Sequence, residues 1–361
     1  MQRKPSGSLR RGWTTGACAT AATRAAYTAL LTGDFPDPVR IDLPGGRRPA
    51  FALARQSLAA DRATAGVIKD AGDDPDVTHC ALVLASVRRG EPGSGVVFRA
   101  GPGVGTVTLP GLPLAVGEPA INPAPRRMIQ QAVAEVAAEH GEAGDLEVEI
   151  AIPEGEELAR RTLNDRLGIV GGLSVLGTSG VVVPYSCAAW IASIHQGIDV
   201  ARAAGLVHLA AATGKTSEAA VAELYGLPAM ALLDMGDFAG GVLKYLRAHS
   251  VARLSIAGGF AKIGKLGQGH LDLHSGRSSV DFTWLADRLA ELGGDGELLA
   301  AARAANTAQQ VLELARAAGL PLADMVADRA RVAAAEVVGE AVAVEVLIFD
   351  RQGELVGRSG A

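Results

Sequence analysis

The sequence predicts an α/β fold in two domains: an N-terminal α+β domain with an antiparallel sheet over residues 1–165, and a Rossmann-like α/β domain with a mostly parallel sheet over residues 166–339. Strand-like runs separated by glycine-containing turns fill much of the first part of the chain. From about Leu167 the pattern changes to apolar strands that alternate with helices, which is typical of a parallel sheet covered on both faces. With 361 residues, 48% of them hydrophobic, the chain is long enough for two such cores.

A helix is expected near the amino terminus, in the alanine-rich run ACATAATRAAYTALL. Thr14 or Thr15 can cap its start, and Gly33 ends it. The runs VRIDLP and RPAFALA follow on either side of Gly45–Gly46, which is a two-glycine hairpin signal. CALVLASVRR and GVVFRAG flank the turn GEPGSG in the same way, so we expect antiparallel strands here.

A second helix and one more strand complete the first predicted domain. The helix starts near Asn122–Pro123, with proline at its first position, and ends at Gly141. The run DLEVEIAIP then predicts a strand, because apolar and charged residues alternate along it.

The second domain is predicted from strands that alternate with helices. The strands LVHLAAAT, AMALLDMG and RLSIAGG end at Thr213–Gly214, Gly236–Asp237 and Gly258–Gly259, and open parallel sheets bind their ligands outside such carboxyl ends. The segment from Ser279 to about Gly339 is alanine-rich and predicted to be mainly helical. Residues 340–361 predict a hairpin, and the sequence leaves open which of the two domains it joins.

Charge and cysteine content exclude several classes of protein. A net charge of −5 and a pI near 5.8 argue against nonspecific binding of nucleic acid. No run of about 18 apolar residues is present to span a membrane, and no apolar segment follows the basic amino terminus as in a secretory signal. Three cysteines, far apart in the sequence, favour a reducing compartment over a disulfide framework or a zinc site. We therefore expect a soluble cytoplasmic protein.

The densest group of reactive side chains is the run KDAGDDPDVTHC, residues 69–80, which we call the acidic loop. It contains four aspartates and then Thr78 and His79, and Gly72 and Pro75 place it outside a helix. Because like charges repel, the loop needs either internal caps and turns or an external partner that is cationic or rich in hydroxyl groups. Both interpretations are open: a set of Asx turns, or a functional site that includes His79.

Two shorter motifs point less specifically to ligands. Gly214-Lys215-Thr216 resembles the end of a phosphate-binding loop, but Leu209 stands where that motif requires its first glycine. No G-x-G-x-x-G dinucleotide motif is complete. His270, Asp272 and His274 alternate and would share a metal only on an extended strand, so we favour a polar turn there.

Six blocks of the sequence resemble a known family, and they occur in order along the chain. They are RRGWTTGACATAA (Arg10–Ala22), KDAGDDPDVTH (Lys69–His79), GVGTVTLPGLPLAVGEPAINPAPRRMI (Gly103–Ile129), LGIVGGLSVLGTSGVVVPYS (Leu167–Ser186), MGDFAGG (Met235–Gly241) and FAKIGKLGQGHLDLHS (Phe260–Ser275). Blocks of this length are far more specific than one short glycine motif. The chain resembles CbiD, the cobalt-precorrin-5B (C1)-methyltransferase family of cobalamin biosynthesis. One departure is Cys80, where the resemblance leads us to expect a small residue such as glycine.

The resemblance implies transfer of a methyl group from S-adenosylmethionine to carbon 1 of cobalt-precorrin-5B, which gives cobalt-precorrin-6A. The cobalt belongs to this corrinoid substrate, so no protein-bound metal is expected, and neighbouring enzymes of the pathway are further expected partners. Displacement at a sulfonium methyl mainly requires that the nucleophilic carbon be held in line with the leaving sulfur. Orientation can supply roughly 7–11 kcal/mol of such a barrier.

The resemblance also leads us to assign roles to particular residues. The predicted catalytic residues are His79, Asp76 and Asp74. They are expected to hold the ribose hydroxyls, to offset the sulfonium charge or, for His79, to take a proton. The predicted cofactor-binding residues are Asp73, Asp74, Gly177, Thr178, Gly236, Asp237 and Gly258. The predicted substrate-binding residues hold carboxylates of the macrocycle: Arg126, Lys262, Lys265 and His270. Because an acidic loop repels a polycarboxylate, we expect Asp73–Asp76 on the cofactor side; for Gly177, tight packing is an equally good explanation.

Two other functional classes stay open at this point. A noncatalytic tetrapyrrole carrier would bind a corrinoid and hand it between enzymes without consuming S-adenosylmethionine. A reductase or nucleotide-using enzyme of the same pathway is the second class, and the incomplete dinucleotide and phosphate-binding motifs count against it.

Overall fold

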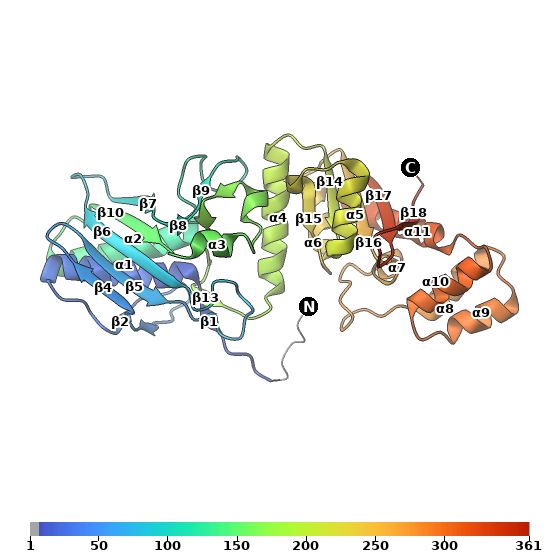
Figure 1. Cartoon of the computed structure of the whole chain (residues 1–361), viewed down its shortest axis with the longest axis horizontal. Helices are drawn as coiled ribbons and strands as arrows, with labels where there is room; N and C mark the ends of the chain where they lie inside the picture. The colour runs from blue at the N-terminus through green and yellow to red at the C-terminus, as the bar shows by residue number, and fades with distance from the viewer. Residues whose placement is uncertain (1–6, 361) are drawn as a thin grey trace. The chain divides into compact units, whose positions relative to one another are not determined.

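The structure is a computed structural model that describes residues 7–360. The chain divides into two compact units, Met1–Ser186 and Cys187–Ala361 (Figure 1). Both units mix helices with strands, and antiparallel as well as parallel pairs occur, so the predicted α/β class is confirmed. The basic amino-terminal run begins in residues 1–6, which lie outside the described part of the chain.

The first unit consists of short strands and helices around one five-stranded sheet. Its helices are α1 Thr15–Thr32, α2 Pro123–His140 and α3 Gly155–Ala159. Its strands are β1 Gly12–Trp13, β2 Val39–Arg40, β3 Ala50–Phe51, β4 Arg55–Leu58, β5 Ala63–Ile68, β6 Leu82–Arg89, β7 Val96–Ala100, β8 Gly103–Val104, β9 Thr106–Val107, β10 Leu146–Ala151, β11 Ile169–Val170, β12 Gly172–Leu173 and β13 Val181–Val182.

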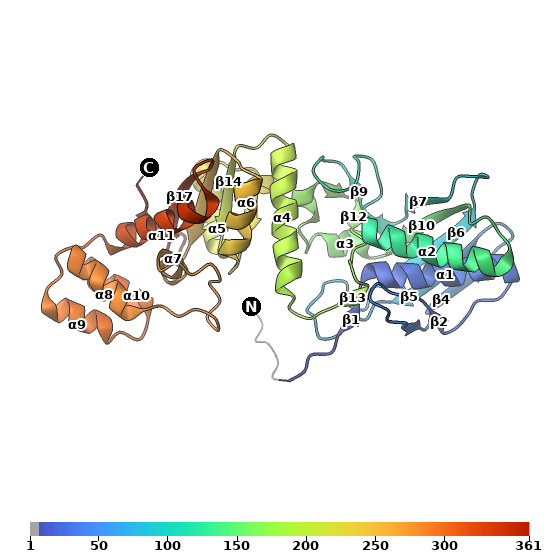
Figure 2. The same cartoon turned by 180° about the vertical axis from the view of Figure 1, so that it is seen from behind.

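Helix α1 begins and ends where the sequence predicts. The side chain of Thr14 accepts a hydrogen bond from the backbone N–H of Ala17, and Gly33 adopts a left-handed φ of 88° as its N–H bonds to Ala29. Alanines along the helix are almost completely buried, because α1 packs against β5 and β6 on one side and against α2 on another (Figure 2). Small side chains allow this close approach, so α1 forms the centre of the first hydrophobic core.

The five-stranded sheet has the order β4-β5-β6-β10-β7. The pairs are antiparallel except that β10 runs parallel to β7. The prediction that the GEPGSG turn joins two neighbouring antiparallel strands was wrong, because β10 lies between β6 and β7. The carboxylate of Asp145, directly before β10, accepts the N–H groups of Gly93 and Gly95 at 2.9 and 2.7 Å. These two hydrogen bonds attach the GEPGSG turn to the start of β10. The β2–β3 pairing around Gly45–Gly46 is antiparallel as predicted.

The first unit extends to Ser186, beyond the boundary expected near residue 165. The reason is strand pairing: β11 pairs with β9, β12 with β8 and β13 with β1. Residues 169–182 therefore belong to the first unit, although their glycine-rich sequence is unlike that of the strands before them.

The second unit contains one five-stranded sheet and the remaining helices. Its helices are α4 Cys187–Ala203, α5 Lys215–Tyr225, α6 Ala239–Ala248, α7 Phe260–Gly267, α8 Phe282–Glu291, α9 Gly296–Arg303, α10 Ala308–Ala317 and α11 Leu322–Val338. Its strands are β14 His208–Ala212, β15 Leu232–Asp234, β16 Arg253–Gly258, β17 Ala343–Phe349 and β18 Leu355–Arg358.

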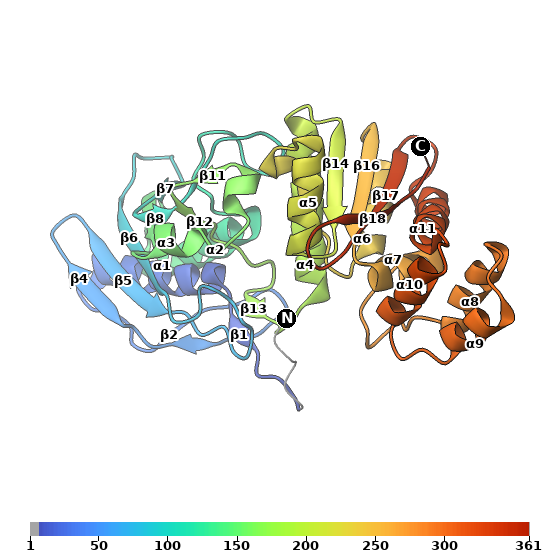
Figure 3. The ribbon, with the colours of Figure 1, turned by 45° about the vertical axis from the view of Figure 1, so that its right-hand side comes forward.

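The order of this second sheet is β15-β14-β16-β17-β18, and its strands are parallel except for β18. Helix α5 packs on one face, whereas the large core on the other face is formed with α4, α6, α7 and α11 (Figure 3). The C-terminal hairpin β17–β18 is part of this sheet because β17 pairs with β16. From β14 the chain passes to β15 on one side and then to β16 on the other, so the strand order reverses between β14 and β16.

Candidate active site

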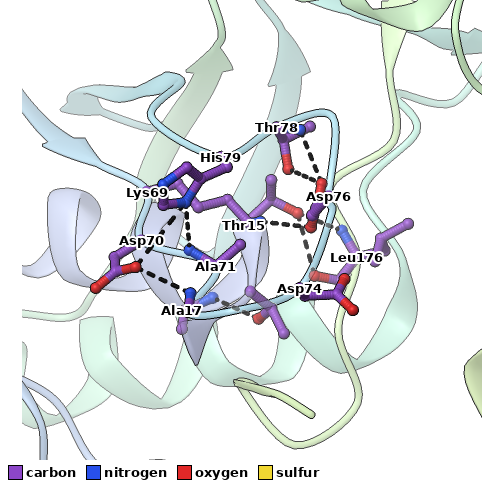
Figure 4. Close-up of polar contacts among 12 residues, drawn as sticks. Thr15, Ala17, Lys69, Asp70, Ala71, Asp74, Asp76, Thr78, His79 and Leu176 are labelled. Carbon is purple, nitrogen blue, oxygen red and sulfur yellow. Dashed lines mark hydrogen bonds and ion pairs between the residues drawn. The ribbon is translucent and has the colours of Figure 1, made fainter. Parts of the chain in front are cut away.

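Segments that are far apart in the sequence meet at the start of helix α1. The backbone N–H of Trp13 donates to the carbonyl of Asp70 at 2.7 Å, which places the acidic loop beside this segment. On another side, the N–H of Gly16 donates to the carbonyl of Leu176 at 3.0 Å. The hydroxyl of Thr15 also exchanges hydrogen bonds with the backbone of Leu176, at 3.1 and 3.2 Å (Figure 4). We call residues 10–17, 69–80 and 174–185 the first cluster.

Two aspartates of the acidic loop are paired with cations of the same unit. Asp70 forms a bidentate ion pair with the guanidinium of Arg10, and the hydrogen bond from this group lowers the pKa of Asp70 to about 2. Asp76 accepts from Nζ of Lys69 at 2.6 Å, and the Lys69 side chain is only 1% exposed. Burial raises the pKa of Asp76, but the charge of Lys69 and the hydrogen bonds from Lys69 and Thr78 outweigh it, so the net pKa lies below the ordinary value.

The other two aspartates accept backbone N–H groups. Asp73 accepts the N–H of Arg10 at 2.6 Å, and Asp74 accepts the N–H of Tyr185 at 2.8 Å. All four carboxylates are therefore engaged from within the first unit. The charge of the loop is therefore offset by Arg10, by Lys69 and by backbone N–H groups of the same unit, most of them from outside the loop.

His79 lies on the same loop and is attached through one ring nitrogen. Its Nδ1 accepts the backbone N–H of Ala71 at 3.1 Å, while Oδ1 of Asp70 lies 3.9 Å from that nitrogen (Figure 4). The side chain is 44% exposed. Within residues 7–360, the structure gives no hydrogen-bond partner to Nε2. His79 is thus fixed by its inner edge and open at its outer edge.

Gly177 and Thr178 belong to the segment that packs on the start of α1. Gly177 has a φ of 125°, and a Cβ atom at this position would lie 2.3 Å from the side chain of Thr14. A glycine is required here by the backbone and by close packing, which favours the packing explanation. Thr178 is exposed beside it.

Arg126 closes the turn before α2. Its guanidinium donates to the carbonyl oxygens of Ile121 and Pro119 at 2.8 and 3.1 Å, and it pairs with Glu118 at 2.8 Å. The neighbouring Arg127 is exposed and, in the described part of the chain, has no ion pair. The Arg127 guanidinium is therefore accessible to an external anion, whereas that of Arg126 is engaged within the unit.

A second cluster lies in the second unit, where three of the predicted residues meet. Lys262 forms an ion pair with Asp237, and both Lys262 and Lys265 donate from Nζ to the carbonyl of Leu273 at 3.1 Å. Asp237 and Lys265 are 6% and 5% exposed. Burial lowers the pKa of Lys265, and repulsion from Lys262 lowers it further. These groups hold the 271–273 segment against the loop after β15, which limits their reach toward a ligand.

The alternating histidines and aspartate after α7 form a polar turn, as favoured from the sequence. Asp272 accepts the N–H of His274 at 3.1 Å and pairs with Arg277 at 2.6 Å. Nδ1 of His274 accepts the N–H of Gly276 at 3.1 Å. His270 lies apart from this turn and has no side-chain hydrogen bond among the residues that the structure describes.

The strand ends of the second unit supply open space. A Cβ atom at Gly258 would lie 2.8 Å from the hydroxyl of Thr213, so the loops after β14 and β16 are adjacent. A Cβ atom at Gly214 or Gly259 would meet nothing within 4 Å. Helices α5 and α7 start directly after these glycines, and neither has a side-chain N-cap. Lys215 is exposed in the first turn of α5.

The predicted residues thus fall into separate groups. The acidic-loop residues and Gly177 gather in the first cluster, whereas Gly236, Asp237 and Gly258 belong to the second unit. Our residue assignments omitted Gly214, Lys215 and Gly259, although the strand-end rule had marked both glycines. Arg126 was chosen for a substrate carboxylate but is turned inward, because the sequence does not reveal which of two adjacent arginines packs against the chain.

No set of three or more His, Cys, Asp or Glu side chains in residues 7–360 is grouped to hold a metal ion. None of the helices in that range has the length and apolar character that crossing a membrane requires.

The sequence is similar to one family of proteins in both units of the chain. A sequence model of CbiD matches residues 2–184, and one of the CbiD C-terminal domain matches residues 272–360. The curated cobalt-precorrin-5B C(1)-methyltransferase of Paramagnetospirillum magneticum is 61% identical over 97% of this chain and 98% of that protein. Proteins of the same name from Methylorubrum extorquens and a Bradyrhizobium species are 62% and 63% identical over 97% of this chain, and over 97% and 93% of their own lengths.

A crystal structure of the cobalamin biosynthesis protein CbiD from Archaeoglobus fulgidus aligns with 87% of this chain and 86% of its own, at 23% identity and a TM-score of 0.41. The family assignment comes from the family models and the near-full-length relatives. Together they show that the chain belongs to the CbiD family.

Proposed function

We propose that this protein transfers a methyl group from S-adenosylmethionine to carbon 1 of cobalt-precorrin-5B, giving cobalt-precorrin-6A in cobalamin biosynthesis. The observation that carries the proposal is the similarity to proteins named cobalt-precorrin-5B C(1)-methyltransferase, which spans both units at 61–63% identity. The three cysteines are free thiols, which fits a reducing cytoplasm as the place of reaction.

We place the cofactor at the carboxyl edge of β14 and β16, in the manner of a Rossmann-like sheet. Ligands of open α/β sheets bind where the strand order reverses, and here the reversal lies between these two strands. Gly214 and Gly259 leave open space, and the uncapped N–H groups of α5 and α7 begin there. The exposed ammonium of Lys215 is a suitable partner for the cofactor carboxylate.

We place the substrate macrocycle against the first cluster. The sequence suggested the cofactor for this place, because an acidic loop repels carboxylates. The pairing of Asp70 with Arg10 and of Asp76 with Lys69 offsets half of that charge, and Asp73 and Asp74 are bound to backbone N–H groups. Arg11, before α1, and Arg127, near the start of α2, are exposed and have no ion pair in the described chain, so they are available to carboxylates.

The reaction needs alignment more than acid–base chemistry. Carbon 1 supplies an electron pair to the methyl carbon, the bond from that carbon to the sulfonium sulfur breaks, and its electrons neutralise the sulfur. Asp237, Lys262 and Lys265 then act by holding the loop next to Gly236 in place, because their charged groups are turned inward. Alignment of carbon 1 with the methyl carbon and the leaving sulfur supplies the rate enhancement.

A steric variant tests the cofactor site. Gly259 has φ −75° and ψ 154°, which any residue adopts, so Gly259→Val should fold but fill the open space. We expect titration calorimetry to show binding of S-adenosylmethionine and S-adenosylhomocysteine by the wild type and at least tenfold weaker binding by this variant. Gly296→Val, at the first residue of α9, where a Cβ atom would likewise meet nothing within 4 Å, is the control and should bind normally.

An activity assay with the corrinoid substrate and labelled S-adenosylmethionine tests the reaction itself. Transfer of the label to the corrinoid supports the proposal. Tight corrinoid binding without any consumption of S-adenosylmethionine would overturn it in favour of a carrier.

A further inference from the structure

The hydrogen bond between Ala71 and His79 determines which ring nitrogen carries a proton. The backbone N–H of Ala71 points at Nδ1 of His79 at 3.1 Å, so Nδ1 uses its lone pair as an acceptor. A neutral imidazole has one N–H and one acceptor nitrogen, and the proton must therefore be on Nε2. The same ring with a proton on Nδ1 would direct two N–H groups at each other.

The neighbouring carboxylate does not reverse this assignment. A histidine that acts as a base usually donates Nδ1–H to a carboxylate, which leaves the lone pair of Nε2 free. Here the nearest carboxylate oxygen, Oδ1 of Asp70, lies 3.9 Å from Nδ1. That oxygen already accepts the N–H of Gly72 at 2.9 Å, and Arg10 occupies the same carboxylate. Asp70 therefore belongs to the ion pair with Arg10.

The backbone of His79 is held as firmly as its ring. The N–H of His79 donates to the carbonyl of Asp76 at 3.0 Å, and the next N–H, of Cys80, donates to Lys69 at 2.8 Å. The outer edge of the ring is free, since the side chain is 44% exposed and Nε2 has no hydrogen-bond partner in residues 7–360. A fixed ring with one exposed N–H is a preorganised hydrogen-bond donor.

We propose that His79 binds a carboxylate oxygen of the corrinoid substrate through Nε2–H and does not take a proton in the reaction. This inference rests on the proposed function, because it assigns His79 to the substrate. It replaces the roles predicted for this residue from the sequence, which were to hold the ribose hydroxyls, to offset the sulfonium charge or to take a proton. The exposed Nε2–H of His79 needs a hydrogen-bond acceptor from the ligand. The carboxylates of an acidic macrocycle are such acceptors.

Two substitutions separate a donor from a base. In His79→Gln, the amide nitrogen takes a position similar to Nε2 and can still donate. In His79→Asn, the shorter amide can still accept from Ala71 but does not reach the substrate. We expect KM for the corrinoid to rise about 10- to 100-fold in the Asn variant with kcat little changed, and to stay within a few-fold of wild type in the Gln variant. His140→Gln, at the exposed end of α2, is the control and should have no effect.

Other outcomes would overturn the inference. A base would lose about 10²- to 10⁴-fold in kcat in both variants, because neither amide accepts a proton. Weaker binding of S-adenosylmethionine with unchanged corrinoid binding would move His79 to the cofactor. Thermal unfolding of each variant shows whether a loss reflects misfolding.

Two readouts do not depend on methyl transfer. Nitrogen-15 NMR of the histidine side chains should show Nε2 of His79 protonated and Nδ1 unprotonated; the reverse would refute the assignment. Calorimetry with cobyrinic acid, a corrinoid with free carboxylates, should show binding that weakens in His79→Asn. If the wild type binds this probe more tightly than His79→Asn does but transfers no methyl group, the proposed function is refuted and the role of His79 in binding is retained. If it transfers methyl groups and His79→Asn binds the probe normally, only the present inference fails.

Discussion

The carboxylate of Asp74 accepts the backbone N–H of Tyr185 at 2.8 Å, and Tyr185 has a φ of 55°. A non-glycine residue in this left-handed region is strained by about 1–2 kcal/mol relative to its ordinary conformation. The strain persists only where neighbouring contacts hold the backbone, and the hydrogen bond from the acidic loop is such a contact. Asp74 therefore ties the end of the first unit to its most highly charged loop.

Loss of this contact should release Tyr185. We expect Asp74→Ala to lower the free energy of unfolding by about 1–2 kcal/mol, because a hydrogen bond to a charged group is lost. Tyr185→Gly should offset part of this loss in the double variant, since glycine adopts the left-handed conformation without strain. Urea denaturation measures both. Asp61→Ala, at an exposed loop position, is the control; an equal loss there would contradict the specific role of Asp74.

Cys80 should be replaceable with a gain in stability. It has a φ of 66°, in the region that favours glycine, and the family resemblance led us to expect a small residue such as glycine there. We expect Cys80→Gly to raise the free energy of unfolding by about 1 kcal/mol. Cys80→Ala removes the thiol but keeps the backbone strain, so its stability should equal that of the wild type. An equal gain in the alanine variant would mean that the thiol, and not the backbone, is unfavourable.

The buried ion pair of Lys69 and Asp76 should show strong coupling. Lys69→Met keeps the length of the side chain but leaves Asp76 without its cation, and we expect a loss of about 2–3 kcal/mol. The double variant Lys69→Met/Asp76→Asn should lose less than the sum of its single variants, which a urea double-mutant cycle measures. Additive losses would show that the pair contributes nothing specific. Lys244→Met, at an exposed position on α6, is the control.

Acid should weaken the second unit through Glu345, which is 9% exposed on β17. Its carboxylate accepts hydrogen bonds from Tyr225, Arg253 and Arg358. Burial raises the pKa of Glu345, but these hydrogen bonds outweigh it and lower the pKa to about 2. A lowered native pKa stabilises the fold above the unfolded value of 4.5, and this contribution is lost as pH falls toward 2.

Glu345→Gln should therefore lower stability at neutral pH by roughly 2–3 kcal/mol and flatten its dependence on pH between 4.5 and 2. Unfolding in urea at a series of pH values measures this dependence. Glu354→Gln, in the turn of the same hairpin, should leave the curve unchanged. If the stability of the Glu345 variant changed with pH as steeply as that of the wild type, the acid sensitivity would come from other carboxylates.

The elements that local chemistry specifies could be predicted from the sequence. The cap by Thr14, the stop at Gly33 and the proline start of α2 depend on residues within a few positions of one another. The apolar strands β14, β15 and β16 were likewise visible, because burial on both faces leaves a continuous apolar run.

Other features depend on contacts between distant segments, and the sequence could not supply them. The charge of the acidic loop is offset by Arg10, about sixty positions earlier, and by a backbone group of Tyr185, more than one hundred positions later. Lys262 and Lys265 are spaced so that both could bind carboxylates from one face of a helix. Instead both donate to the carbonyl of Leu273, because the loop after α7 folds back onto that helix. Spacing within an element does not reveal what packs against it.

The insertion of β10 between β6 and β7 has a consequence for synthesis on the ribosome. Until residues 146–151 emerge, β6 and β7 are both present as nascent strands with open edges, and they are separated by a turn that would allow them to pair with each other. Such edges are sites for wrong pairing and aggregation, and the correct partner arrives only after α2 has been made. The first unit should therefore acquire its sheet late in translation, and a nascent chain that stops before β10 should be recognised by chaperones as unfinished.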